Sequence, residues 1–257
     1  MEINVSFAPP EDGPEAGPVM VGWFLTSDKG AVLYDAPERL VLRAPNRAHA
    51  KSAARCPAVI QLESRYFVVK CPYDLHVGFK REDSGKPVLI NRAGAASPIR
   101  GNKLGEVLSL VAEAEWRFPD RPTIQLKLPY CFVADEMVYL SQIGTFAHYR
   151  PDPLPGTIFG GRFPLTIWPR PLMWAFEWHD PQKDLILKRG EPLFYVQFEP
   201  VDPSRAVQLV EAERTPELLA YIDQIGGVVN YVNQTFGLFK AAEALRPKRL
   251  LVAKQRD

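Results

Sequence analysis

Residues 172–178 carry the sequence Leu-Met-Trp-Ala-Phe-Glu-Trp, and this stretch decides the fold class. Trp174, Phe176 and Trp178 alternate with smaller or polar residues, so large apolar side chains recur at every second position. Side chains two residues apart lie on the same face of a β-strand, whereas a helix repeats about every 3.6 residues. The stretch therefore predicts a strand with one face in a core and a more solvent-exposed opposite face.

The same alternation extends toward the N-terminus. It occurs at 124–128 and 108–116, and further short apolar runs between turn residues predict more strands at 19–25, 31–34, 40–43, 58–62, 66–70 and 75–79. No helical pattern of about 10–15 residues separates these runs, which disfavours a βαβ architecture. We therefore predict a mainly β fold, an antiparallel sandwich of jelly-roll or distorted-barrel type.

The pattern changes at residue 215. Thr215-Pro216-Glu217 combines an N-cap residue, a proline at the first helical position and an early acid, which together predict a helix start. Gly226-Gly227 predicts a break into two helices. Large apolar residues follow at alternating spacings of four and three, forming a stripe of Leu218, Ile222, Ile225, Val229, Val232, Phe236 and Phe239.

The stripe has two interpretations. It either docks on the β domain of its own chain or pairs with another chain. Because large apolar side chains are costly to leave in water, one of these must cover it. The neutral net charge offers little resistance to self-association, so we expect a homo-oligomer through residues 216–240.

These patterns divide the chain into two parts. Residues 1–203 form the predicted β domain, in which the Pro- and Gly-rich residues 8–18 predict a surface loop. Residues 204–257 form a C-terminal helical segment and a basic tail. The tail carries Arg246, Lys248, Arg249, Lys254 and Arg256.

Composition narrows the class of protein. The 257 residues include 31 Lys plus Arg and 30 Asp plus Glu, and the net charge of +1 disfavours nucleic acid or an anionic membrane as a partner. The N-terminus lacks the features of a signal peptide, and no apolar run is long enough to span a membrane. Cys56, Cys71 and Cys131 are widely spaced and fit buried thiols in a reducing compartment. We therefore expect a cytoplasmic protein.

The segment at 172–201 resembles the closing segment of a bacterial family of unknown function. That family ends in an aromatic strand, a turn, a short strand and Gly-Glu-Pro before an apolar strand, matched here by Trp174, Phe176 and Gly190-Glu191-Pro192. The resemblance extends to the strands at 105–132, implies a β fold and carries no established activity. The turn at 188–192 also resembles the closing strand of dUTPase-like proteins, although their catalytic aspartate and phosphate loops are not recognisable here.

Two carboxylate–imidazole pairs occur at a spacing of two residues. Asp74 pairs with His76 and Glu177 with His179, and each pair shares a face if its segment is a strand. If the two strands are neighbours, these side chains converge on one divalent metal such as iron, with open positions for substrate, as in non-haem iron enzymes. The alternative is that the histidines are surface or hydrogen-bonded structural residues.

Aromatic side chains concentrate in residues 146–198. They either pack the core of the sandwich or line an apolar pocket for a small molecule. We select Trp168, Trp174, Trp178 and Tyr149 as ligand-binding candidates. The sequence thus predicts a β-fold protein that binds a small molecule, with a metal-assisted modifying enzyme and a non-catalytic binding or oligomeric assembly module as the two alternatives.

Overall fold

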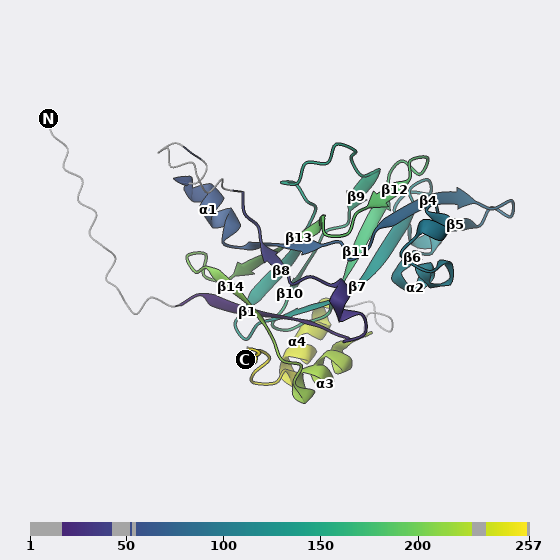
Figure 1. Cartoon of the computed structure of the whole chain (residues 1–257). Helices are drawn as coiled ribbons and strands as arrows, with labels where there is room; N and C mark the ends of the chain where they lie inside the picture. Colours follow the sequence, from purple (N-terminus) through teal and green to yellow (C-terminus); the bar gives the residue numbers. More distant parts are fainter. Residues whose placement is uncertain (1–16, 43–51, 53–54, 228–234, 256–257) are drawn as a thin grey trace.

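The computed structural model describes residues 17–42, 52, 55–227 and 235–255, and its architecture is mainly β (Figure 1). The strands form three sheets that include a curled half-barrel, and two helices follow near the C-terminus. The predicted β class with C-terminal helices is confirmed, and the finer assignment to a jelly roll or distorted barrel stays a prediction. The predicted loop at 8–18 lies outside the described residues except for Gly17 and Pro18.

The largest sheet contains the alternating sequence that predicted the fold. Its strand order is β14-β1-β7-β11-β9, and β6 also pairs with β7. The bounds are β14 Val207–Glu211, β1 Val19–Leu25, β7 Thr123–Val133, β11 Pro171–Trp178, β9 Gly156–Ile158 and β6 Leu108–Leu110. These strands pair antiparallel except that β1 and β14 run parallel, so the antiparallel prediction does not hold for this one pair.

A second sheet packs against the first. Its order is β10-β8-β13-β3-β2, with bounds β10 Gly161–Pro164, β8 Val138–Ile143, β13 Pro192–Pro200, β3 Tyr66–Lys70 and β2 Glu38–Arg39. Phe132 of β7 meets Phe198 of β13 with ring centroids 5.4 Å apart. Both sheets contribute to one apolar cluster, so the inward faces of the alternating strands form the main core.

A third sheet and several short helices complete the β region. The sheet has the order β12-β4-β5, with bounds β12 Leu185–Leu187, β4 Leu75–Arg81 and β5 Pro87–Asn91. The short helices are α1 Pro57–Glu63, α2 Leu104–Val107 and the 3-10 turns η1 Ala31–Leu33, η3 Gly94–Ala96, η4 Gly101–Lys103 and η5 Glu113–Glu115.

The C-terminal helices cover the outer face of the largest sheet. They are α3 Pro216–Ile225 and α4 Thr235–Leu245, drawn below β1 in Figure 1. Along β7, Phe132 belongs to the main core while Cys131 and Val133 belong to a second apolar cluster that includes Leu218. Because neighbouring residues of a strand point to opposite faces, the helices lie on the face opposite the main core.

The packing joins the predicted C-terminal segment to the β region and buries part of the apolar stripe against its own chain. β14 lies within the predicted C-terminal segment, yet it pairs with β1 and extends the largest sheet. Leu218 and Ile225 of the stripe are 0% and 4% exposed against their own chain. Val229 and Val232 lie outside the described residues, so the homo-oligomer stays a prediction.

Four predicted strands form differently in the structure. The run at 31–34 forms the 3-10 turn η1, because Gly30 at φ 70° turns the chain immediately before it. In the run predicted at 40–43, residues 40–42 lie outside any strand, since β2 pairs with β3 only through Glu38 and Arg39.

The run at 58–62 is helical in α1, because Pro57 at the first position starts a helix after extended Cys56. The strand predicted at 108–116 ends at Leu110, where the chain leaves the ladder and turns so that Trp116 Nε1 donates to Val111 O at 2.9 Å. Among the described helices, none is long and apolar enough to cross a membrane.

Candidate ligand-binding site

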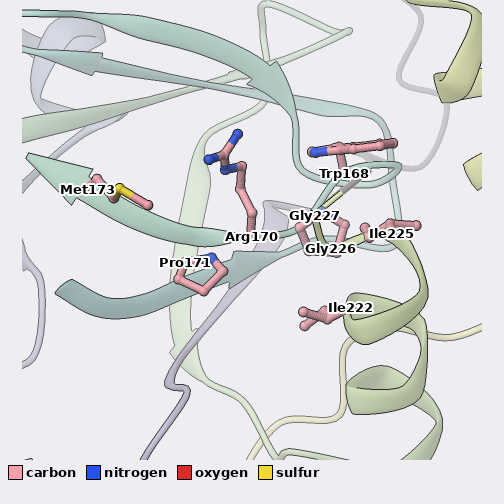
Figure 2. A pocket seen from close by; sticks show the side chains of 9 residues that line it. Trp168, Arg170, Pro171, Met173, Ile222, Ile225, Gly226 and Gly227 are labelled. Carbon is pink, nitrogen blue, oxygen red and sulfur yellow. The ribbon is translucent and has the colours of Figure 1, made fainter. Parts of the chain in front are cut away.

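A pocket lies where the chain between β10 and β11 meets the end of α3 (Figure 2). Its volume is about 150 Å³. The lining is apolar apart from one guanidinium and one indole nitrogen, and consists of Trp168, Pro169, Arg170, Pro171, Met173, Ile222, Ile225, Gly226 and Gly227. The pocket therefore sits at the rim of the helical layer, beside the outer face of the largest sheet.

The wall formed by the connection between β10 and β11 is conformationally restricted. Pro169 and Pro171 flank Arg170, and each proline locks its own φ and disfavours the helical region for the residue before it. Trp168 is anchored at both ends: its backbone N–H donates to Pro164 O at 2.9 Å, and its ring packs edge-on against Phe239 at 5.3 Å. This wall is thus preformed.

The opposite wall is held by the first turns of α3. Thr215 Oγ1 caps the helix by accepting from the backbone N–H of Leu218 at 3.2 Å, as the sequence predicts. Tyr221 then ties α3 to the tryptophan wall, because its hydroxyl donates to Ile167 O at 2.6 Å. Burial raises the pKa of Tyr221 to about 12, with a smaller opposing effect of Arg246, so the hydroxyl remains a donor at neutral pH.

The Trp168 indole N–H has no acceptor among the described residues, although Trp168 is only 6% exposed. Two other buried tryptophans are satisfied: Trp116 Nε1 donates to Val111 O, and Trp178 Nε1 donates to Asp180 O at 3.0 Å. Figure 2 shows the nitrogen end of the Trp168 ring turned toward the side on which Arg170 lies. The pocket therefore contains a hydrogen-bond donor for which no described residue supplies an acceptor.

Arg170 is the one charged residue among the described residues that line the pocket. It is exposed and forms no ion pair with any described residue. In Figure 2 its side chain extends between Met173 and Trp168. Lys127 lies directly across from Met173 in the β7–β11 ladder, and opposed residues of an antiparallel pair share a face. The pocket margin is therefore positively charged.

The structure separates the four predicted ligand-binding residues. Trp168 lines the pocket described above, whereas Trp174 and Trp178 are 1% and 0% exposed and belong to the main core. Trp174 also borders a second pocket of about 370 Å³ between the two large sheets. Tyr149 is 84% exposed and lines neither pocket.

The four predicted metal ligands form two separate arrangements. His76 Nε2 lies 2.8 Å from Asp184 Oδ2, and Asp74 accepts a backbone N–H from Arg189 at 3.0 Å. Glu177 and His179 do come together, with 2.9 Å between Glu177 Oε1 and His179 Nε2. Within the described ranges, no three His, Cys, Asp or Glu side chains are grouped so as to hold a metal ion. The proposed iron cofactor stays a prediction without an assembled site.

Glu177 and its neighbours form an ion-pair network near the end of β11, a strand that lies between β7 and β9. Glu177 is 2% exposed and is held by Arg117, whose Nε lies 3.0 Å from Glu177 Oε2. Thr157 Oγ1 lies 3.2 Å from the same Nε2 of His179 that faces Glu177. A carboxylate–imidazole–hydroxyl relay needs both ring nitrogens. This geometry therefore neutralises a buried charge and does not activate a nucleophile.

Sequence reasoning missed Arg170 and Met173 as members of a site. The signal that identifies this wall is Trp168-Pro169-Arg170-Pro171, in which two prolines fix a cation beside an aromatic ring. The two halves of the pocket are about 50 residues apart in the chain, and their meeting follows only from helix docking.

Comparisons with family models, curated proteins and solved structures found no match to this chain.

Proposed function

We propose that this protein binds a small molecule in the pocket between Trp168 and α3. The observation that carries the proposal is the indole N–H of Trp168, which has no acceptor among the described residues and, in a side chain that is otherwise 6% exposed, remains open toward the pocket. Most of the Trp168 side chain is buried, so its N–H presents a fixed donor at the pocket surface. A ligand that supplies an acceptor there gains a hydrogen bond, which usually contributes about 0.5–1.5 kcal/mol.

The size of the pocket limits the ligand. An apolar cavity of about 150 Å³ accommodates a benzene-sized group, and the volume of this pocket is the same. Ile222, Ile225 and Met173 supply the apolar contacts, which suit one ring or a short branched chain. The bound group is therefore either a whole small molecule or the end of a larger one.

The lining supports binding and offers no acid–base chemistry. Arg170 is the one charged side chain among the described lining residues, and the others carry no hydroxyl, thiol, imidazole or carboxylate. General acid–base or nucleophilic catalysis needs such a group within hydrogen-bonding reach. Of the two alternatives from the sequence, we therefore favour the non-catalytic binding module.

The test follows the indole N–H directly by ¹H–¹⁵N correlation spectra. The probes are benzamide and benzoate, each a single ring with an oxygen acceptor, titrated into the millimolar range expected for such small ligands. We expect at least one probe to shift the Trp168 indole cross-peak saturably, assigned by its loss in Trp168→Phe. The Trp116 and Trp178 peaks serve as controls, because both donors are already paired.

The two possible results are distinct. Among the indole peaks, a saturable shift of Trp168 with no shift of Trp116 or Trp178 is expected. The affinity of Trp168→Phe, read from the backbone amide cross-peaks of Ile222 and Ile225, is expected to be about 2- to 10-fold weaker if the indole hydrogen bond contributes the usual 0.5–1.5 kcal/mol. A Trp168 peak that neither probe moves overturns the proposed function.

A further inference from the structure

We infer that the ligand of this pocket is a carboxylate attached to a single ring or a short branched chain. The inference rests on the proposed function, because it specifies the chemistry of the same site. Its basis is the juxtaposition of two donors, the Trp168 indole N–H and the Arg170 guanidinium, at one side of an apolar pocket (Figure 2).

The polar groups of the lining side chains are donors only. An indole has one N–H, a guanidinium has five, and neither accepts a hydrogen bond. Arg170 makes no ion pair with a described residue, and the lining contains no acid that could neutralise it. A ligand group that complements this wall must therefore accept hydrogen bonds and carry negative charge.

The surrounding charges favour the same sign. Lys127 lies across the ladder from Met173 and, like Arg170, forms no ion pair with a described residue. A ligand approaching the outer face of the sheet at this point meets two cations that no described residue neutralises. Long-range attraction of an anion is therefore expected, and it should weaken as the ionic strength rises.

The helix end determines how such an anion is oriented. The pocket is bordered by the last residues of α3, Ile222 and Ile225, where the helix dipole is negative. This effect is weaker than a charge-assisted hydrogen bond from a guanidinium. The carboxylate is therefore placed toward Arg170, and the apolar body packs on the isoleucines.

The geometry of the Arg170 guanidinium and the charge of the lining favour a carboxylate over a phosphate. A guanidinium presents two parallel N–H groups that match the two oxygens of a carboxylate. A phosphate monoester carries a charge of about −1.5 to −2 and three acceptor oxygens. Within the described lining, Arg170 supplies the one full positive charge, which neutralises a single carboxylate, whereas Lys127 lies outside the lining and contributes only at longer range.

The experiment compares benzoate with benzamide, which have nearly the same shape and differ in charge. Dissociation constants come from the Trp168 indole cross-peak at low ionic strength. We expect benzoate to bind about 5- to 10-fold more tightly than benzamide, since charge-assisted hydrogen bonds are roughly twice as strong as neutral ones. Arg170→Gln is expected to abolish this preference and Lys127→Gln to reduce it.

Arg162→Gln is the matched control. Arg162 is also an exposed arginine, on β10, but it pairs with Glu199 and does not line the pocket. We expect this variant to keep the preference for benzoate. Unchanged Trp116 and Trp178 cross-peaks in each variant show that the fold is intact.

The outcomes separate the two proposals. Equal affinities of benzoate and benzamide at Trp168 overturn the carboxylate inference and leave the binding function standing. An Arg170→Gln protein that still prefers benzoate also overturns it, as does tighter binding of phenyl phosphate than of benzoate. Failure of both ring compounds to move the Trp168 peak overturns the binding function itself.

Discussion

At the scale of single residues, Gly22 of β1 shows how closely the C-terminal chain approaches the largest sheet. A Cβ at this position would overlap Leu251 Cδ1 and lie 2.8 Å from Ala212 Cβ. The leucine side chain can rotate, but the Cβ of Ala212 moves only with its backbone. We expect Gly22→Ala to lower the free energy of unfolding by about 1–3 kcal/mol, the usual cost of overpacking, measured by urea denaturation.

Gly105 provides the control for this prediction. No atom lies within 4 Å of a Cβ built at Gly105, which is part of α2. Alanine is a better helix former than glycine, so Gly105→Ala should be neutral or slightly stabilising. Equal urea midpoints for Gly22→Ala and the wild type would contradict the prediction.

Asp184 makes a pH-dependent contribution to stability. Its carboxylate meets His76 Nε2 at 2.8 Å and Arg92 Nε at 3.1 Å. Burial acts to raise the pKa of Asp184, but hydrogen bonds from His76 and Arg92 outweigh burial, and the net pKa is lowered. Because the folded-state pKa lies below the unfolded value of about 3.9, the stabilisation is present above that value and is lost as the pH falls through the folded pKa.

The measurement is the difference in Tm between the wild type and Asp184→Asn from about pH 6 to about pH 2.5. We expect the wild type to be more stable at the upper end and the difference to shrink below roughly pH 4. Asp120→Asn is the control, since Asp120 forms no ion pair with a described residue. A difference that stays constant over the whole range would refute this role of Asp184.

At the scale of elements, α3 tests whether the apolar stripe docks on its own chain. Leu218 is 0% exposed within the second apolar cluster, whereas the adjacent Leu219 is 42% exposed. Leu218→Ala is expected to cost about 2–5 kcal/mol in unfolding free energy, and Leu219→Ala to stay within about 0.5 kcal/mol of the wild type. Neither variant should change the mass measured by light scattering.

A homo-oligomer through residues 216–240, as expected from the sequence, predicts a different result for Leu219→Ala. If a second chain packs on the exposed side of α3, Leu219→Ala lowers the measured mass or the association constant. A mass change in that variant would therefore contradict purely intramolecular docking of this helix.

Elements were predictable where local signals agreed. The alternation around Trp174 predicted β11, and Thr215-Pro216-Glu217 predicted the start of α3, because strand periodicity and capping are properties of neighbouring residues. The run at 58–62 was misassigned because a short apolar segment fits a strand or a helix, and the deciding signal was Pro57.

At the scale of the whole molecule, the largest sheet serves two cores. Along β7, Phe132 packs between the sheets while Cys131 and Val133 pack under α3 and α4. Burial on both faces explains the near-continuous apolar run at the end of β7. In a sheet with one solvent-exposed face, apolar and polar residues would alternate along the strand. The candidate pocket lies where this second core ends.

The sequence by itself determined the β class, the aromatic strands and the helix start at Thr215, because these depend on periodicity and on neighbouring residues. Only the tertiary structure decided which side chains share a site. It paired His76 with Asp184 and kept Glu177 with His179, since strand order, absent from any local pattern, sets such neighbours. It also brought Trp168 and Arg170 to Ile225, because the packing of α3 on the sheet joins segments that are remote in the chain.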